Sequence, residues 1–160
     1  MPQESEEPLA PEAEKRVREV FSRVPFPRLL GMQIESLGRG ACRMSVRLRD
    51  DLRQRYGVMH GGVISSLIDT AVAYAIYPQI PEGCEITTVE MKVSFLASVR
   101  DGGRAVAEAR LLRLGRTLAV CACDVRDEGG RHVAAALVTY MVIPAPAGGD
   151  PARGLPSTGG

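Results

Sequence analysis

The sequence has almost no excess of charge of either sign, because 20 basic and 19 acidic side chains leave a formal net charge of +1 in 160 residues. Binding to DNA or RNA is driven by a basic surface, so we expect no nucleic-acid partner. No apolar run approaches the ~20 residues that a membrane-spanning helix needs, so we also expect no membrane partner. The amino-terminal stretch is acidic and polar and lacks the apolar segment of a signal peptide, which favours a cytoplasmic protein.

Histidine and paired cysteine motifs are scarce as well. Only His60 and His132 occur, and the four cysteines form no C-x-x-C pair. Cys121 and Cys123 are expected on one face of a strand, where a thiol packs as a small apolar group. The sequence therefore predicts no metal site and no bound cofactor, and it fits a reducing compartment.

What the chain does have is enough apolar residues, 45% of the total, for the core of one domain. Residues 1–11 and 144–160 are rich in Pro, Gly, Glu and Ser and are expected to be flexible tails, which leaves the domain over 12–143. Short glycine-bearing connections favour antiparallel strands, so we assign the chain to the α+β class, with its helices on one face of the sheet. In chain order we expect a helix over 11–24 that Pro25 and Pro27 end, a hairpin around Gly38–Gly40, a helix over 61–77, and strands over 85–97, 104–114, 117–127 and 131–143.

The segment 61–77 separates into two faces when its residues are placed at helical spacing. One face is apolar and centres on Leu67 and Ile68. The other is a narrow stripe of small and polar residues with one carboxylate: Gly62, Ser65, Ser66, Asp69 and Ala73. An ordinary surface helix carries long charged side chains there, so the stripe indicates close approach by something else, and a second copy of the same helix is the economical candidate. Spacing alone leaves a second interpretation open, in which the stripe is solvated.

The same helix begins with the sequence His60-Gly61-Gly62. The unpaired N–H groups and the dipole of a helix N-terminus attract anions, and glycines let a ligand oxygen approach these amides closely. His60 can donate a hydrogen bond or orient a carbonyl there. Together with Asp69, about two turns later, this indicates donors aimed at a developing oxyanion, as acyl transfer requires. A lone histidine is more often a cap or a packing residue; the glycine pair and the carboxylate favour the functional interpretation.

The stretch GVMHGGVISSLIDTAVAYA resembles the helix signature of hotdog-fold acyl-CoA thioesterases, specifically the phenylacetate-pathway (PaaI-like) group. FPRLLGMQIESLGRG and TTVEMKVSFLASVRDG resemble the family's first hairpin and third strand, and the following strands extend the likeness over about residues 20–143. The resemblance implies a long helix wrapped by a curved antiparallel sheet of about six strands, preceded by an N-terminal helix. It also implies hydrolysis of an acyl-CoA substrate, of which coenzyme A is a part, by a homo-oligomer: a dimer with active sites at its interface, and a tetramer formed by two such dimers.

The resemblance also implies roles for individual residues. Asp69 corresponds to the catalytic carboxylate, acting as general base or nucleophile on a thioester bound at the other chain's helix N-terminus. The Gly61 amide corresponds to the oxyanion donor, with His60 beside it, and Thr88 corresponds to the residue that positions a water or the carboxylate. Gln54 departs from the family, which usually has Asn there, and a longer stem displaces the amide by about 1 Å, enough to change a rate.

Contacts to the rest of the substrate follow from its chemistry. Coenzyme A carries phosphates, and Arg100, Arg104 and Arg116 fall in or near loops that border the site in relatives, with Arg116 the first choice. Each of them has the alternative role of an ordinary surface arginine. Gly62 and Ser65 are expected to contact the substrate from the helix stripe.

Two other functions remain open beside hydrolysis. A non-catalytic acyl-CoA-binding module or sensor is compatible with the Gln54 departure, although a DNA-linked sensor needs more helices before the sheet than this chain provides. A hotdog dehydratase needs a different arrangement of histidine and acid, and His132, in the turn before the last strand, is poorly placed as a partner for His60.

Overall fold

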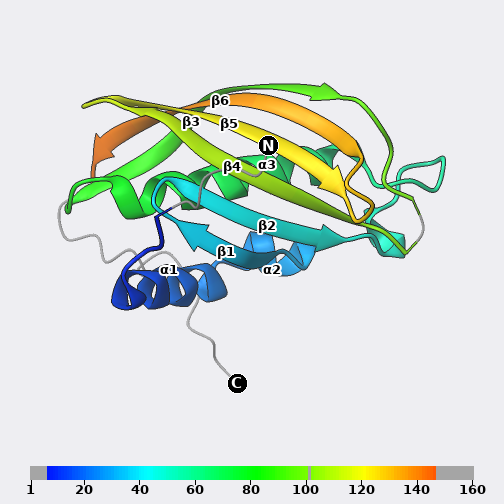
Figure 1. Ribbon diagram of the computed structural model, residues 1–160, viewed down its shortest axis with the longest axis horizontal. Coiled ribbons are helices and arrows are strands. Elements are labelled where there is room, and N and C mark those ends of the chain that lie inside the picture. The colour runs from blue at the N-terminus through cyan, green and yellow to red at the C-terminus, as the bar shows by residue number, and fades with distance from the viewer. Residues whose placement is uncertain (1–6, 101, 147–160) are drawn as a thin grey trace.

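The computed structural model describes residues 7–100 and 102–146, and the outer parts of both expected tails, 1–6 and 147–160, lie outside this range. Six strands form one antiparallel sheet in the order β1-β2-β4-β5-β6-β3, and one long helix, α3, lies against its concave face (Figure 1). This confirms the α+β class and the hotdog arrangement. The elements are α1 (Pro11–Arg23), α2 (Pro25–Leu30), β1 (Gln33–Gly38), β2 (Ala41–Arg47), the short 3-10 helix η1 (Asp50–Leu52), α3 (Gly61–Ile76), the 3-10 helix η2 (Tyr77–Gln79), β3 (Cys84–Phe95), β4 (Arg104–Leu114), β5 (Leu118–Asp127) and β6 (His132–Pro144).

The amino-terminal segment contains one helix more than predicted. Pro25 ends α1 as expected, but it also begins α2, because proline fits the first turn of a helix, where its missing N–H has no partner to lose. Val24 is extended between the two helices, and Gly31, with a φ of 72°, ends the second in the left-handed conformation that glycine adopts readily. Glu7 precedes α1, and its carbonyl accepts a hydrogen bond from the Arg39 N–H at 2.8 Å. This end of the expected tail therefore pairs with the β1–β2 turn.

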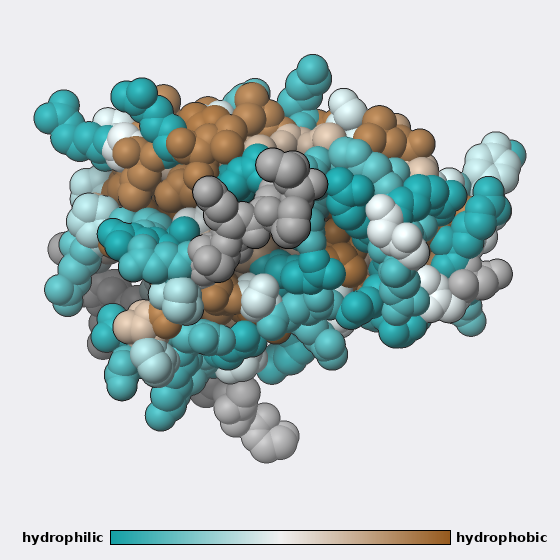
Figure 2. Space-filling view, viewed as in Figure 1, coloured by the Kyte–Doolittle hydropathy of each residue, from teal (hydrophilic) through white to brown (hydrophobic). Residues whose placement is uncertain are grey.

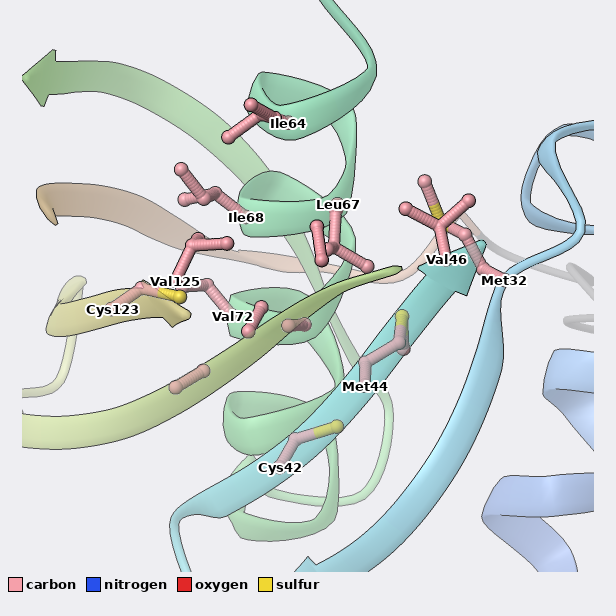
Figure 3. Close-up of a cluster of buried hydrophobic side chains, with 14 of the residues drawn as sticks. Met32, Cys42, Met44, Val46, Ile64, Leu67, Ile68, Val72, Cys123 and Val125 are labelled. Atoms are coloured by element: carbon pink, nitrogen blue, oxygen red, sulfur yellow. The ribbon is translucent and has the colours of Figure 1, made fainter. Parts of the chain in front are cut away.

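The core lies between α3 and the concave face of the sheet. Leu67, Ile68 and Val72 of α3 are fully buried, and they point toward Met44 of β2 and Val125 of β5 (Figure 3). Each such side chain contributes about 1.5–3 kcal/mol on burial. The apolar face of α3 is therefore fixed to the sheet, which determines the direction in which its opposite face points.

The two cysteines of β5 face this core, as predicted. Cys121 and Cys123 alternate with outward residues, and both are buried. Burial raises the pKa of the Cys121 thiol to about 12, so the thiol stays protonated and packs as a small apolar group.

The convex face of the sheet has two different halves. On the β1–β2–β4 half, Arg43 pairs with Glu35 and Glu108, and Arg104 also pairs with Glu35. On the β3–β5–β6 half, apolar side chains gather at the upper edge of the molecule (Figure 2). The large exposed residues there include Leu118, Leu137 and Met141. No helix in the described part of the chain is long and apolar enough to cross a membrane.

Candidate active site along the central helix

The predicted division of α3 into two faces is confirmed. Its apolar face is buried, whereas Ser65, Ser66, Asp69 and Ala73 of the stripe are half-exposed and Gly62 is exposed. Ser66 donates from its hydroxyl to the Gly62 carbonyl at 2.8 Å, within the helix. The Ser65 hydroxyl makes no hydrogen bond to another described residue. The stripe therefore presents one carboxylate and one free hydroxyl to whatever lies outside.

Two hydroxyl groups hold the Asp69 carboxylate. Thr88 Oγ1 donates to Asp69 Oδ1 at 2.9 Å, and the Tyr140 hydroxyl lies 2.7 Å from the same oxygen and 2.8 Å from the Asp69 carbonyl. Among the described residues, no donor reaches Asp69 Oδ2. The arrangement fixes one carboxylate oxygen and leaves the other available to a water or a substrate.

Sheet register explains how the two hydroxyls meet. Thr88 on β3 and Tyr140 on β6 are direct cross-strand partners, so their side chains share the face that looks at α3. A bulge follows at once, because the register shifts between Thr88 and Glu90. Bulges bend a strand and re-aim neighbouring side chains, and this one lies next to the carboxylate.

Tyr140 was missed by the sequence analysis. It lies in a strand that is apolar on both faces, VAAALVTYMVI, and it is one of the few polar groups there. Its side chain is 4% exposed, and burial, with the hydrogen bond to the Asp69 carboxylate, raises the pKa of Tyr140 far above its usual range. A buried hydroxyl in an apolar strand needs a partner, and that requirement was the available signal.

His60 is the N-cap of α3. Its Nδ1 accepts a hydrogen bond from the Gly62 N–H at 2.8 Å, which places the ring proton of the neutral form on the exposed Nε2 side. Capping is the alternative that the sequence analysis set aside, and it is the role observed for Nδ1. Because this bond uses the Gly62 amide, Gly62 does not offer its N–H to a ligand.

The amide that remains available is that of Gly61. Among the described residues the Gly61 N–H has no acceptor, because the first N–H groups of a helix have no partner within it; those of Val63 and Ile64 donate to the His60 carbonyl. A Cβ atom at Gly61 would lie 3.4 Å from the Phe95 ring, so a side chain would narrow the approach to this amide. A free N–H at a helix N-terminus is a suitable donor to a developing oxyanion.

Gly61 and Asp69 are too far apart to act on one carbonyl group within a single chain. Eight residues of α-helix separate them, which is ~12 Å along the axis at 1.5 Å per residue. A hydrogen bond and an attacking atom must both lie within about 3–3.5 Å of the reacting group. The geometry therefore requires that the two residues come from different copies of α3 if they act together.

Gln54 uses its side chain locally. Its Oε1 accepts from the Tyr56 N–H at 2.8 Å, and its backbone pairs with Val58 and Gly57 in the loop before α3. The neighbouring Arg53 donates to Asp50 and to the Gly57 carbonyl. The residues of the loop thus hydrogen-bond to one another, and the carbonyl oxygen of the Gln54 amide accepts one of these bonds.

Of the three arginines predicted to meet coenzyme A, Arg100 and Arg116 lie at opposite ends of the sheet. Arg100 borders a cavity of about 480 Å³ beside the start of α3, where the Met59 N–H donates to the Val99 carbonyl at 3.0 Å. Arg116 lies in the β4–β5 turn, roughly 30 Å away along β4 at about 3.3 Å per residue. Arg104 is engaged with Glu35 and Glu128. One chain therefore does not bring Arg100 and Arg116 to the same phosphate.

An apolar pocket of about 310 Å³ adjoins Asp69. Its inner wall follows α3 from Asp69 and continues to Tyr77 at the start of η2, and its outer wall comes from α1, α2 and the residue between them. Apart from Asp69, its lining is apolar, aromatic or hydroxyl-bearing: Val20, Val24, Phe26, Pro27, Thr70, Ala73, Tyr74, Tyr77, Ile86 and Tyr140. Within residues 7–100 and 102–146, no three His, Cys, Asp or Glu side chains lie close enough together to hold a metal ion.

Known proteins resemble this chain in both sequence and fold. Residues 56–134 match the family described as the thioesterase superfamily. The medium/long-chain acyl-CoA thioesterase YigI of Salmonella typhimurium is 28% identical over 149 residues, which cover 83% of this chain and 96% of that protein. A thioesterase family protein from Silicibacter pomeroyi superposes with a TM-score of 0.76 at 29% identity, over 83% of this chain and 99% of that one.

The PaaI protein of the E. coli phenylacetic acid degradation operon superposes with a TM-score of 0.77, over 84% of this chain and 95% of that one. At 22% identity this likeness shows the fold alone. The family match takes in His60, Gly61, Asp69 and Thr88, but it begins after α1 and α2 and ends before Tyr140. The region that the family model matches thus contains the helix and its stripe, and α1 and α2 precede it.

Proposed function

This chain belongs to the thioesterase superfamily, a family of thioester hydrolases, and from that premise we propose that it hydrolyses acyl-CoA thioesters to a free carboxylic acid and coenzyme A. The observation that carries the proposal is the Asp69 carboxylate, held by Thr88 and Tyr140 with one oxygen free, at the end of an apolar pocket. The likeness to YigI, named as a medium/long-chain acyl-CoA thioesterase, supports coenzyme A as the thiol.

Two copies of the chain form each active site in this proposal. The ~12 Å between Gly61 and Asp69 on one helix supports pairing Gly61 of one copy with Asp69 of the other. β3 is a twelve-residue edge strand, and an unpaired edge of that length is a ready surface for twofold pairing. The apolar half of the convex face supports the association of such dimers into tetramers.

The reaction follows from these positions. The thioester carbonyl oxygen accepts from the Gly61 N–H, which stabilises the negative charge of the tetrahedral intermediate. In the general-base route, Asp69 Oδ2 takes a proton from a water whose oxygen attacks the carbonyl carbon; the C–S bond then breaks and the thiolate is protonated. In the nucleophile route, Oδ2 itself attacks, coenzyme A leaves, and water hydrolyses the resulting anhydride. Thr88 and Tyr140 orient the carboxylate in both routes.

Four further residues are candidates for contacts to the substrate in this two-chain arrangement. Arg100, beside the start of α3, is the nearer candidate for a coenzyme A phosphate at the Gly61 end, and Arg116 is a candidate only at the far end of the sheet. The free Ser65 hydroxyl and the exposed Nε2 side of His60 are polar groups that can contact the substrate beside them.

The test is turnover of an acyl-CoA panel by the wild type and by Asp69→Asn, followed as loss of the thioester absorbance because the chain has four thiols of its own. We expect kcat to fall by roughly 10²–10⁴-fold in the variant, while a non-hydrolysable thioether analogue still binds. Asp124→Asn, on the convex face beside His132, is the matched control and should keep its activity.

A second function is favoured by one observation. The Gln54 amide carbonyl is bonded within its own loop, so a plain acyl-CoA-binding module is the alternative to an enzyme. Binding of the thioether analogue by a wild type that hydrolyses no thioester would support that alternative and refute hydrolysis.

A further inference from the structure

We infer that the apolar pocket beside Asp69 receives the acyl group and selects acyl chains of medium length, with α1 and α2 as the wall that sets the limit. The inference rests on the proposed thioesterase function, because it takes Asp69 as the point where the thioester carbonyl lies. Among the residues that the structure describes, no other charged side chain lines the pocket, and burial raises the pKa of Tyr74 to about 12, so its hydroxyl is neutral. Such walls favour an uncharged hydrocarbon body over a dicarboxylic or amino-substituted one.

The length of the pocket follows from the helix that forms its inner wall. Asp69, Ala73 and Tyr77 mark a line of eight residues, or ~12 Å, along α3 and its end. An extended chain advances by roughly 1.2 Å per bond, since three backbone bonds span about 3.3–3.6 Å. About ten bonds therefore reach from the carboxylate to Tyr77.

The volume supports a chain of the same size. A dry apolar cavity of about 150 Å³ accommodates benzene. The pocket, at about 310 Å³, is roughly twice as large. Beyond its end the surroundings change, because Glu85 and Arg16 both lie close enough to influence the Tyr77 hydroxyl. A longer acyl chain would thus pass from apolar walls to charged neighbours.

The outer wall belongs to this chain's own amino-terminal segment. Val20 of α1, Val24 of the link and Phe26 and Pro27 of α2 close the pocket opposite α3. These residues precede the region that matches the thioesterase superfamily, which begins at residue 56. In this proposal α3 supplies the carboxylate and the amide, whereas α1 and α2 supply selection among acyl groups.

The test is the profile of kcat/KM against chain length, from butyryl- through octanoyl- and decanoyl- to palmitoyl-CoA. In the wild type each added methylene should raise kcat/KM by about fourfold until the pocket is full, and palmitoyl-CoA should be a poorer substrate than decanoyl-CoA. Val24→Phe fills the outer wall, so it should lower kcat/KM for decanoyl-CoA by about tenfold or more while butyryl-CoA is unaffected.

Two further variants separate selection from damage to the fold. Leu29→Phe adds a similar ring to α2 at an exposed position that does not line the pocket, and it should leave the profile unchanged. Tyr77→Ala opens the far end and should move the optimum toward longer chains, a gain that unfolding cannot produce.

The two possible failures are distinct. An active wild type whose length profile is the same in Val24→Phe, Tyr77→Ala and Leu29→Phe would overturn the assignment of the pocket and leave hydrolysis intact. A wild type that hydrolyses none of these thioesters would overturn the proposed function itself, and the acyl pocket with it.

Discussion

Replacing Tyr140 by phenylalanine isolates one hydrogen bond at the candidate site. The ring is buried between β6 and α3, so Tyr140→Phe keeps its packing and removes only the hydroxyl. That hydroxyl lies 2.7 Å from Asp69 Oδ1 and 2.8 Å from the Asp69 carbonyl. Without it, Thr88 remains the sole described donor to the carboxylate, and Asp69 can turn away from the position it holds now.

The magnitude can be worked out from the chemistry of that bond. A hydrogen bond to a charged group is worth about 1.5–3 kcal/mol. If this hydrogen bond holds Asp69 in the orientation that reacts, its loss raises the activation free energy by the same amount, and kcat falls roughly 10- to 150-fold. The free energy of unfolding should fall by only about 1 kcal/mol. The phenylalanine ring leaves no cavity, and the hydroxyl that is lost would in any case have exchanged its bond to Asp69 for a bond to water on unfolding.

The assay compares kcat, KM and the thermal midpoint of Tyr140→Phe with those of the wild type. Thr139→Val is the matched control, because it removes a hydroxyl from the neighbouring residue of β6, where that hydroxyl donates to Glu90 and not to Asp69. Thr88→Val removes the second hydroxyl, and the double variant should lose less than the product of the two single losses, because both donors orient one oxygen. Unchanged kcat in Tyr140→Phe, beside an active Asp69-dependent wild type, would refute the idea that the hydroxyl positions the carboxylate.

Three other expectations follow from the structure. His60→Ala removes the ring nitrogen that accepts from the Gly62 N–H, so we expect a loss of about 1 kcal/mol in thermal or denaturant unfolding, and an unchanged midpoint would show that the cap contributes nothing. Burial raises the pKa of Glu35, but the bonds and charges of Arg43, Ser45 and Arg104 outweigh it and hold that pKa below 4.5. Glu35→Gln should therefore melt earlier than the wild type at neutral pH, and the difference should vanish as the pH falls through the lowered folded value; a pH-independent difference would contradict this. Of the four thiols only Cys84 is not buried, so a thiol reagent should label one cysteine per native chain rapidly and all four after unfolding, and rapid labelling of two or more native thiols would contradict the packing of β2 and β5.

Periodicity and turn chemistry were sufficient to predict most of the fold. The strand spacing, the glycine-bearing turns and the two faces of α3 each depend on local residue patterns, and each is observed. α2 was missed because a proline that ends one helix can also begin the next, and the sequence alone does not show which role prevails.

The site could be predicted only in part, for a different reason. Asp69 and Thr88 were named together, and their side chains meet at 2.9 Å. Tyr140 was not named, because its role depends on the register that sets β6 beside β3, a property of residues 52 positions apart. The pocket could not be predicted either, because its outer wall comes from α1 and α2, which are distant from α3 in the sequence and meet it only in the folded structure.

One continuous helix, α3, carries both proposed functional groups: the free Gly61 amide in its first turn and the Asp69 carboxylate ~12 Å further along. In the proposed pair each helix therefore serves both reaction centres at once, giving a donor to one and a base to the other. A chain altered at Gly61 and a chain altered at Asp69 would then complement each other: in a mixed pair one reaction centre loses both groups, and the other keeps an intact amide and an intact carboxylate.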